Sequence, residues 1–301
     1  MVRVPAAMLD PFEAFTCFNS PYAEHDDGRA IDLYPGTRTA PSPVSGEVVQ
    51  IERVRAPWRP YARMYDYVVA IDTGGGDEPI TDETSHEAAI ARVLHVEPTV
   101  EVGDHVEIGD PLGPLVRAGF FAPWVGNHLH VGFRPPGADL IRAGGSLPLT
   151  LDVEVTPLHW DGVGVVSQAT RTFVTLSVPS VMDTSSTGWV GLSTDDGGVI
   201  DGGLPHYRYG GRIDALTGRH PDRSTRHETM LLGAPVGTTT GATIAWDDLV
   251  VRANDEAVTG LSLFCARPDR FEIKLVTAGH GYAPGDEVSV VIDADAAVTR
   301  R

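Results

Sequence analysis

Two Gly-Asp turns lie six residues apart in the segment Val102-Gly-Asp-His-Val-Glu-Ile-Gly-Asp-Pro-Leu-Gly113. Apolar and polar residues alternate between the turns, which is typical of short strands joined by tight turns. The same turn recurs at Pro284-Gly-Asp286, and alternating apolar runs include Tyr67-Val-Val-Ala-Ile71 and Val288-Ser-Val-Val-Ile292. Few segments carry the period of a helix. The sequence therefore predicts an all-β protein.

A change in residue use near residues 144–157 indicates two domains. The chain has 301 residues, of which 42% are apolar, so it is long for one compact domain and sufficient for two. The residue types that carry chemistry lie before this boundary, and a β-rich region without a dense cluster of them follows. We therefore expect one domain over residues 1–148 and a β-rich accessory domain over residues 149–301.

The chain is strongly acidic, with a formal net charge of −18 from 41 acidic and 23 basic residues, 22 of which are arginine. Such a surface repels phosphate backbones, which argues against nucleic acid as a partner. Two origins are open. A GC-rich genome favours arginine over lysine, whereas a salt-rich cytoplasm screens the repulsion between hydrated carboxylates. The excess of aspartate over glutamate, 26 to 15, favours the second, halophile-like origin.

The sequence offers no means of crossing a membrane, because no run approaches the ~20 apolar residues that a spanning helix needs. The segment Met1–Phe15 carries Asp10 and Glu13 and lacks the basic and apolar regions of a secretory signal. We expect a cytoplasmic protein, or an extracellular one from which a leader has been removed. The two cysteines, Cys17 and Cys265, are expected to be free and buried.

The motif His128-Leu-His130 is the first sign of chemistry. Residues two apart on a strand point to the same face, so the two imidazoles stand side by side. One of them can bind a metal ion while the other reaches water held there. An isolated H-x-H motif is weak evidence, and its weight depends on the segments that accompany it.

Four further segments accompany this motif in a fixed order. They are His25-Asp-Asp-Gly-Arg-Ala-Ile-Asp32, Ala40-Pro-Ser-Pro-Val-Ser-Gly-Glu-Val48, Ala91-Arg-Val-Leu-His95 and Val102–Gly113. Together with Gly126-Asn-His-Leu-His130 they resemble the lysostaphin-type zinc metallopeptidases, which include the peptidoglycan endopeptidases. The resemblance covers about residues 19–137, a little under half of the chain.

The resemblance implies a doubled-hairpin β-sandwich, the duplicated hybrid motif, that binds zinc through His25, Asp32 and His130. It also implies that His95 and His128 transfer protons. Two imidazoles and one carboxylate suit zinc and leave a fourth position open for water. The implied activity is that of a zinc metalloendopeptidase, a hydrolase of peptide (amide) bonds. The implied partner is a peptide or peptidoglycan-like substrate, often with glycine near the cut.

The sequence departs from the family in several places, which include Val93 in place of the tyrosine before His95 and Val131 in place of the phenylalanine after the H-L-H motif. His25 and Asp32 are seven residues apart, where the family usually has four. Asp26 and Asp27 are therefore alternative carboxylate ligands. The loop Gly119-Phe-Phe-Ala-Pro-Trp124 is more apolar than the family pattern, and we expect it to line the substrate groove.

A second interpretation comes from another class of protein. The chain could be a non-catalytic, metal-bearing binding module in which the second domain recognises sugar or peptide. Trp160, Trp189 and Trp246 could stack on a sugar, although tryptophans of a β domain are usually part of its core. The presence of all five site residues favours the enzyme, because inactive relatives usually lack ligands.

Overall fold

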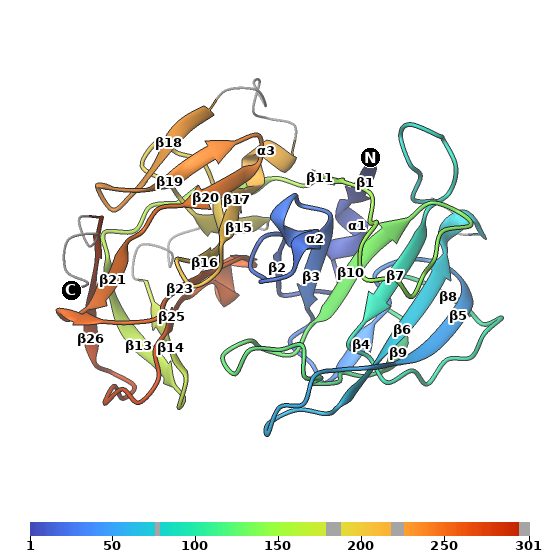
Figure 1. Cartoon of the computed structure of the whole chain (residues 1–301), viewed down its shortest axis with the longest axis horizontal. Coiled ribbons are helices and arrows are strands. Elements are labelled where there is room, and N and C mark those ends of the chain that lie inside the picture. Colours follow the sequence, from blue (N-terminus) through green and yellow to red (C-terminus); the bar gives the residue numbers. More distant parts are fainter. Residues whose placement is uncertain (76–78, 179–187, 218–225, 295–301) are drawn as a thin grey trace. The chain divides into compact units, whose positions relative to one another are not determined.

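The computed structural model describes residues 1–75, 79–178, 188–217 and 226–294. Strands dominate this part of the chain, and the all-β prediction is confirmed (Figure 1). Each α-helix is a single turn of four residues: α1 (Ala6–Leu9), α2 (Ala23–Asp26) and α3 (Ile213–Leu216). Among the described residues, no helix has the length and apolar character needed to span a membrane.

The chain forms two compact units. The first contains Met1–Phe15 and Arg29–Val153, and the second contains Thr16–Gly28 and Glu154–Arg301. The division after Val153 lies close to the boundary expected between residues 148 and 149. The segment Thr16–Gly28 belongs to the second unit although it lies near the N-terminus, a long-range association that local composition does not encode.

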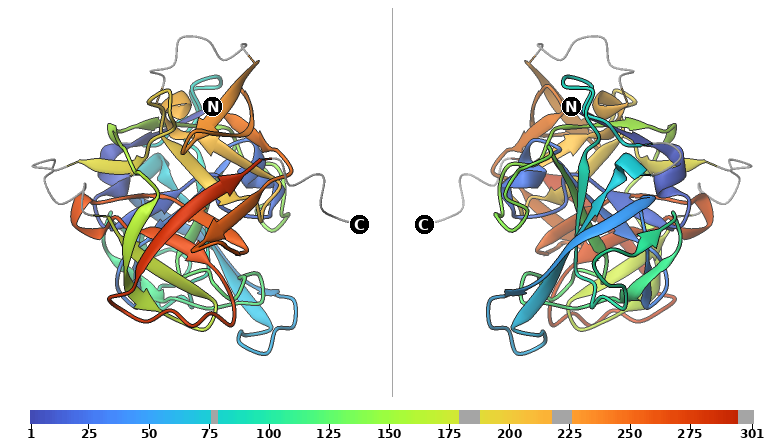
Figure 2. Two further views of the ribbon diagram at one scale, coloured as in Figure 1. Left: turned by 90° about the vertical axis from the view of Figure 1, so that its left-hand side faces the viewer. Right: turned by 90° about the vertical axis from the view of Figure 1, so that its right-hand side faces the viewer.

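An antiparallel sheet forms the centre of the first unit, with six of its strands in the order β3-β10-β7-β6-β5-β8. The right-hand view of Figure 2 shows these strands in blue to green. Val69, Ile71, Val93, Val131 and Phe133 are fully buried and form its core. The strands are β3 (Ala30–Tyr34), β5 (Gly46–Arg55), β6 (Tyr65–Asp72), β7 (Ile90–Leu94), β8 (His105–Val106) and β10 (Leu129–Arg134). Outside this run lie β1 (Val2–Pro5), β2 (Ala14–Thr16), β4 (Thr39–Pro41), η1 (Thr73–Gly75), β9 (Pro111–Pro114) and β11 (Leu149–Asp152).

The predicted Gly-Asp turns are confirmed. The glycine of each has a positive φ, 97° at Gly103, 92° at Gly109 and 98° at Gly285, which glycine adopts without steric cost. In the first unit, the glycine of each turn also donates a backbone hydrogen bond to the segment 42–48. Gly103 N–H donates to Val48 O, and Gly109 N–H donates to Ser42 O. The aspartate bonds are Glu101 N–H to Asp104 Oδ2, Glu107 N–H to Asp110 Oδ2 and Ala283 N–H to Asp286 Oδ2.

The second unit contains a sheet of twelve strands in the order β18-β19-β20-β17-β16-β23-β25-β14-β13-β26-β21-β22. The left-hand view of Figure 2 shows much of it in yellow to red. The strands are β13 (Val163–Ala169), β14 (Phe173–Ser177), β16 (Ile200–Leu204), β17 (Tyr209–Arg212), β18 (Arg226–Leu231), β19 (Ala234–Thr240), β20 (Thr243–Trp246), β21 (Val250–Ala253), β22 (Glu256–Ala257), β23 (Gly260–Leu263), β25 (Ile273–Val276) and β26 (Glu287–Asp293). Also in this unit are β12 (Val155–Leu158), β15 (Trp189–Leu192), β24 (Cys265–Ala266) and η3 (Pro268–Arg270), with β12 and β24 on either side of β15.

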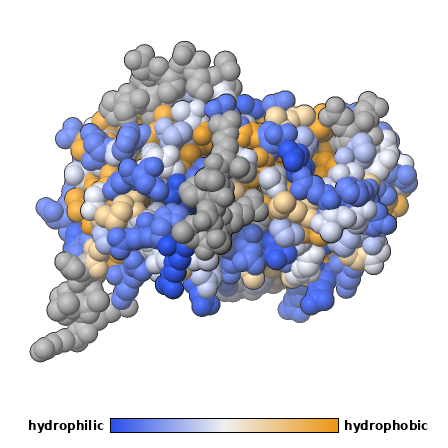
Figure 3. Space-filling view, turned by 90° about the horizontal axis from the view of Figure 1, so that it is seen from above, coloured by the Kyte–Doolittle hydropathy of each residue, from blue (hydrophilic) through white to orange (hydrophobic). Residues whose placement is uncertain are grey.

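Polar and charged residues cover much of the face shown in Figure 3, interspersed with apolar ones. With a net charge of −18, repulsion between carboxylates is expected to destabilise the folded chain at low ionic strength. We therefore expect the melting temperature to rise between about 0.1 M and about 2 M KCl, since the Debye length falls from about 10 Å to below about 3 Å. Differential scanning calorimetry would measure this change. A flat or falling curve would instead favour a genome-composition origin of the acidic surface.

Candidate metal centre

Two neighbouring strands place a carboxylate beside a pair of histidines. His130 on β10 is the register partner of Asp32 on β3, and its Nδ1 lies 2.9 Å from Asp32 Oδ1. Leu129 and Val131, its neighbours on β10, are fully buried, so the alternation of a strand turns His130 to the opposite face. His128 shares that face, and its Nε2 lies 3.3 Å from Asp32 Oδ2. Both histidines of the H-x-H motif therefore reach the same carboxylate.

His25 completes a set of three ligand types. It lies on α2, and its Nδ1 is 2.9 Å from Cys17 O, so Nδ1 donates and Nε2 is the nitrogen suited to a metal. The donor atoms of His25, Asp32 and His130 all lie within 4.8 Å of one another. The single turn of α2 and the positive φ of Gly28, 63°, accommodate the seven-residue spacing.

The donor set fits zinc. Ligand atoms lie about 2.0–2.2 Å from a bound zinc, so small side-chain rotations can bring atoms this close onto one ion. Two imidazoles and one carboxylate are ligands that zinc prefers, and they leave one position open. Of the two alternative carboxylates, Asp27 is exposed and Asp26 is half-buried, and neither belongs to the three-residue group. Asp32 is the carboxylate of the group.

Asp66 holds His95 in place. Asp66 Oδ2 lies 2.5 Å from His95 Nδ1, and Oδ1 accepts the backbone N–H of His95 at 3.1 Å. His95 follows β7 with φ of 71°, a region that residues with a side chain seldom adopt, and the two bonds to Asp66 offset that strain. The His95 ring lies 5.3 Å from the His128 ring and 6.1 Å from the His130 ring. The imidazoles of His95, His128 and His130 therefore lie next to one another.

His128 is held by the backbone and enclosed by aromatic rings. Its Nδ1 lies 2.9 Å from Gly126 O, and the rings of Tyr34 and Phe121 lie 5.0 Å and 4.7 Å from its own. Burial lowers the pKa of His128 to about 4, with Asp32 opposing part of that shift. The imidazole is therefore neutral, with the proton on Nδ1. Its Nε2 and Asp32 Oδ2 are then both acceptors, an arrangement that a cation between them stabilises.

Two family descriptions match the chain. The domain of unknown function (DUF8155) N-terminal domain matches residues 3–151, and the DUF8155 C-terminal domain matches residues 156–293. The chain belongs to the DUF8155 family. The five residues of the candidate centre all fall within the range of the DUF8155 N-terminal domain. No curated protein and no solved structure matches the chain.

Asp201, from the DUF8155 C-terminal domain, fixes the segment that leads to His25. Its fully buried carboxylate accepts bonds from the Thr16 hydroxyl, from Cys17 N–H at 2.6 Å and from Phe18 N–H at 3.1 Å. The carbonyl oxygen of Cys17 in turn accepts a hydrogen bond from His25 Nδ1–H. The chain from Asp201 to the imidazole is therefore continuous, and Asp201 is a positioning residue for His25.

Neither Asp66 nor Asp201 was anticipated from the sequence. Asp66 stands in the run Tyr65-Asp-Tyr-Val-Val-Ala-Ile71, where a carboxylate at the start of an apolar strand was the available signal. Asp201 follows the apolar pair Val199-Ile200 and precedes two glycines, a context that resembles many turns. Their partners are 29 and 183–185 residues away in the chain, which explains why local patterns did not reveal them.

Replacing Asp201 by alanine is expected to lower the free energy of unfolding by about 2 kcal/mol or more, because buried donors then lack an acceptor. Urea unfolding followed by circular dichroism measures this loss. Asp161→Ala is the matched control, since Asp161 is exposed and accepts a bond from Val163 N–H alone. Its loss should stay near about 0.5 kcal/mol. Equal losses in the two variants would contradict the role given to Asp201.

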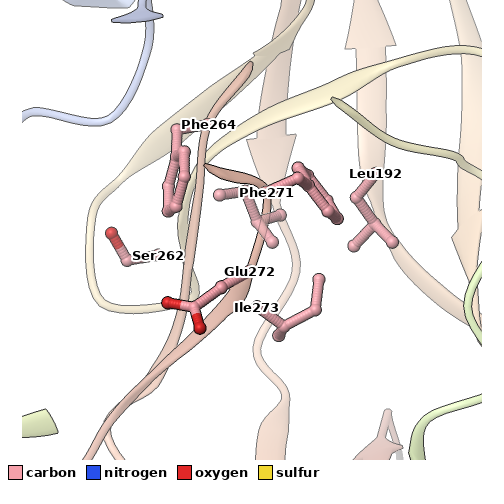
Figure 4. Close-up of a pocket in the computed structure, with 7 residues that line it drawn as sticks. Leu192, Ser262, Phe264, Phe271, Glu272 and Ile273 are labelled. Atoms are coloured by element: carbon pink, nitrogen blue, oxygen red, sulfur yellow. The ribbon is translucent and has the colours of Figure 1, made fainter. Parts of the chain in front are cut away.

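The second unit also has a narrow hollow with no room for a water molecule (Figure 4). Its side chains are mainly apolar, and Glu272 is the ionisable residue among them. Trp160 and Trp189 are buried, as expected of core residues, and Trp246 is half-buried against Gly210. The lining consists of Leu192, Ser262, Leu263, Phe264, Phe271, Glu272 and Ile273.

Proposed function

We propose that this chain is a zinc-dependent metallopeptidase that hydrolyses peptide bonds. The observation that carries the proposal is the convergence of His25, Asp32 and His130, with His95 and His128 beside them. The first three residues would hold the ion through two nitrogens and one oxygen. When bound, zinc lowers the pKa of a water molecule towards neutrality and polarises a carbonyl group.

The two remaining histidines are suited to move protons. His128 is neutral and carries its proton on Nδ1, so Nε2 can accept a proton from water. His95 donates Nδ1–H to the buried carboxylate of Asp66, which fixes the ring beside His128. The proton that His128 takes from water can then pass to the amine that leaves, directly or by way of the neighbouring His95. The arrangement supports hydrolysis of an amide bond.

The experiment combines metal analysis with a peptide panel. Protein purified without added metal should contain close to one zinc per chain, and it should cut at least one peptide of a panel that includes glycine-rich sequences. The panel is run at low and at high KCl concentration, because the fold is expected to need salt. If the protein contains one zinc per chain but cuts no peptide in any condition, the proposed enzymatic function is wrong and the metal-bearing binding module is favoured. Absence of bound metal would overturn both.

A further inference from the structure

A hairpin joins β5 to β6 (Figure 1), and several of its large apolar side chains are exposed. Three large side chains lie within seven residues, with exposed fractions of 68% at Trp58, 37% at Tyr61 and 56% at Met64. Folded domains seldom expose several large apolar side chains together unless the surface binds something. We call residues 53–64 the arginine hairpin.

The arginine hairpin is positively charged in a chain with a net charge of −18. Residues 53–64 include four arginines and no acidic residue. Arg63 pairs with Glu97 at 2.7 Å, whereas Arg53, Arg55 and Arg59 have no carboxylate partner among the residues that the structure describes. An arginine without a carboxylate partner on an acidic protein is available to bind an external anion.

Hydrogen bonds connect this hairpin to the candidate centre. Tyr61 Oη donates to Phe121 O at 3.1 Å, and Gly119 N–H donates to Arg63 O at 3.0 Å. The Phe121 ring then lies 4.5 Å from the His95 ring and 4.7 Å from the His128 ring. The loop 119–124 therefore lies between the arginine hairpin and the two histidines that transfer protons. The arginine hairpin and the two histidines therefore contact the same loop.

We propose that the arginine hairpin binds the substrate, and that the substrate is an acidic peptide with apolar side chains next to its carboxylates. This inference rests on the proposed function. The guanidinium groups of Arg55 and Arg59 would pair with carboxylates of the peptide, and Trp58 and Met64 would cover the apolar side chains. Exposed aromatic residues flanked by arginine are the residue types that dominate binding energy at protein surfaces.

The test compares two labelled heptapeptides that share a phenylalanine and a triglycine stretch. One carries two glutamates before the phenylalanine, and the other carries two glutamines. Binding is measured by fluorescence anisotropy on the full-length His128→Ala protein, at the lowest KCl concentration at which circular dichroism shows it folded. We expect the acidic peptide to bind about tenfold more tightly, since two exposed ion pairs contribute about 1.4 kcal/mol together. The preference should decline as KCl is raised to about 1 M.

Substitution then assigns the preference to the hairpin. Arg55→Gln with Arg59→Gln should reduce the ratio of the two affinities to about one, and Arg59→Gln alone should give an intermediate ratio. Arg171→Gln, at an exposed arginine of the second unit, is the matched control and should keep the parental ratio. Trp58→Ala should weaken binding of both peptides, because it removes apolar contact and not charge.

The outcomes separate this proposal from the proposed function. Equal binding of the two peptides by the parental hairpin would overturn the surface assignment, even if both peptides are cut. An unchanged ratio of the two affinities in the double variant would also overturn it. Tighter binding of a single-stranded oligothymidylate than of the acidic peptide would do the same. If binding depends on the arginines but the parental chain cuts neither peptide, the binding role of the arginine hairpin stands and the proposed peptidase function is wrong.

Discussion

The Asp32→Ala and His130→Ala proteins are expected to contain close to no zinc, whereas the intact chain is expected to contain about one zinc per molecule. Each substitution leaves two protein ligands, and a site with two ligands holds zinc poorly. Hydrolysis should disappear together with the metal. Elemental analysis of protein purified without added metal measures the zinc, and one peptide substrate measures the rate.

Asp27→Ala is the matched control, because Asp27 is exposed and lies outside the three-residue group. It should retain both zinc and activity. Full occupancy in the Asp32 and His130 variants would contradict the ligand assignment. If Asp27→Ala loses zinc and Asp32→Ala retains it, Asp27 is the carboxylate ligand.

His128→Ala and His95→Ala are expected to behave differently from the ligand variants. Both should keep zinc and the fold but lose turnover by a factor of ~10² or more, the usual effect of removing an acid–base or oxyanion partner. His105→Ala is the control, since about half of that side chain is exposed and it lies outside the group. Zinc content and hydrolysis rate of all three variants give the comparison. Parental rates in His128→Ala and His95→Ala would contradict their catalytic roles.

Local patterns in the sequence were sufficient for the features that depend on local geometry. The Gly-Asp turns were predictable because positive φ at Gly103 and Gly109 requires glycine, and the following aspartate caps each turn. The shared face of His128 and His130 followed from the period of a strand. In both cases the residues that interact are close in the chain.

The remaining features depend on long-range packing. The hydrogen bond that His95 donates to Asp66 needs β6 and β7 to pair in one register, which periodicity does not specify. The association of Thr16–Gly28 with the second unit rests on Asp201 and on Ser262, which accepts a bond from Asn19 Nδ2 at 2.7 Å. A boundary read from composition alone therefore assigns that segment to the first domain.

Removal and return of the metal tests the central claim most directly. The intact chain is assayed on one cleavable peptide, stripped with a chelator, dialysed in molar KCl to keep it folded, and supplied with zinc in steps. We expect cleavage to disappear in the stripped protein and to return in full at one zinc per chain. Cleavage that persists in stripped protein with no measurable zinc would contradict the central claim.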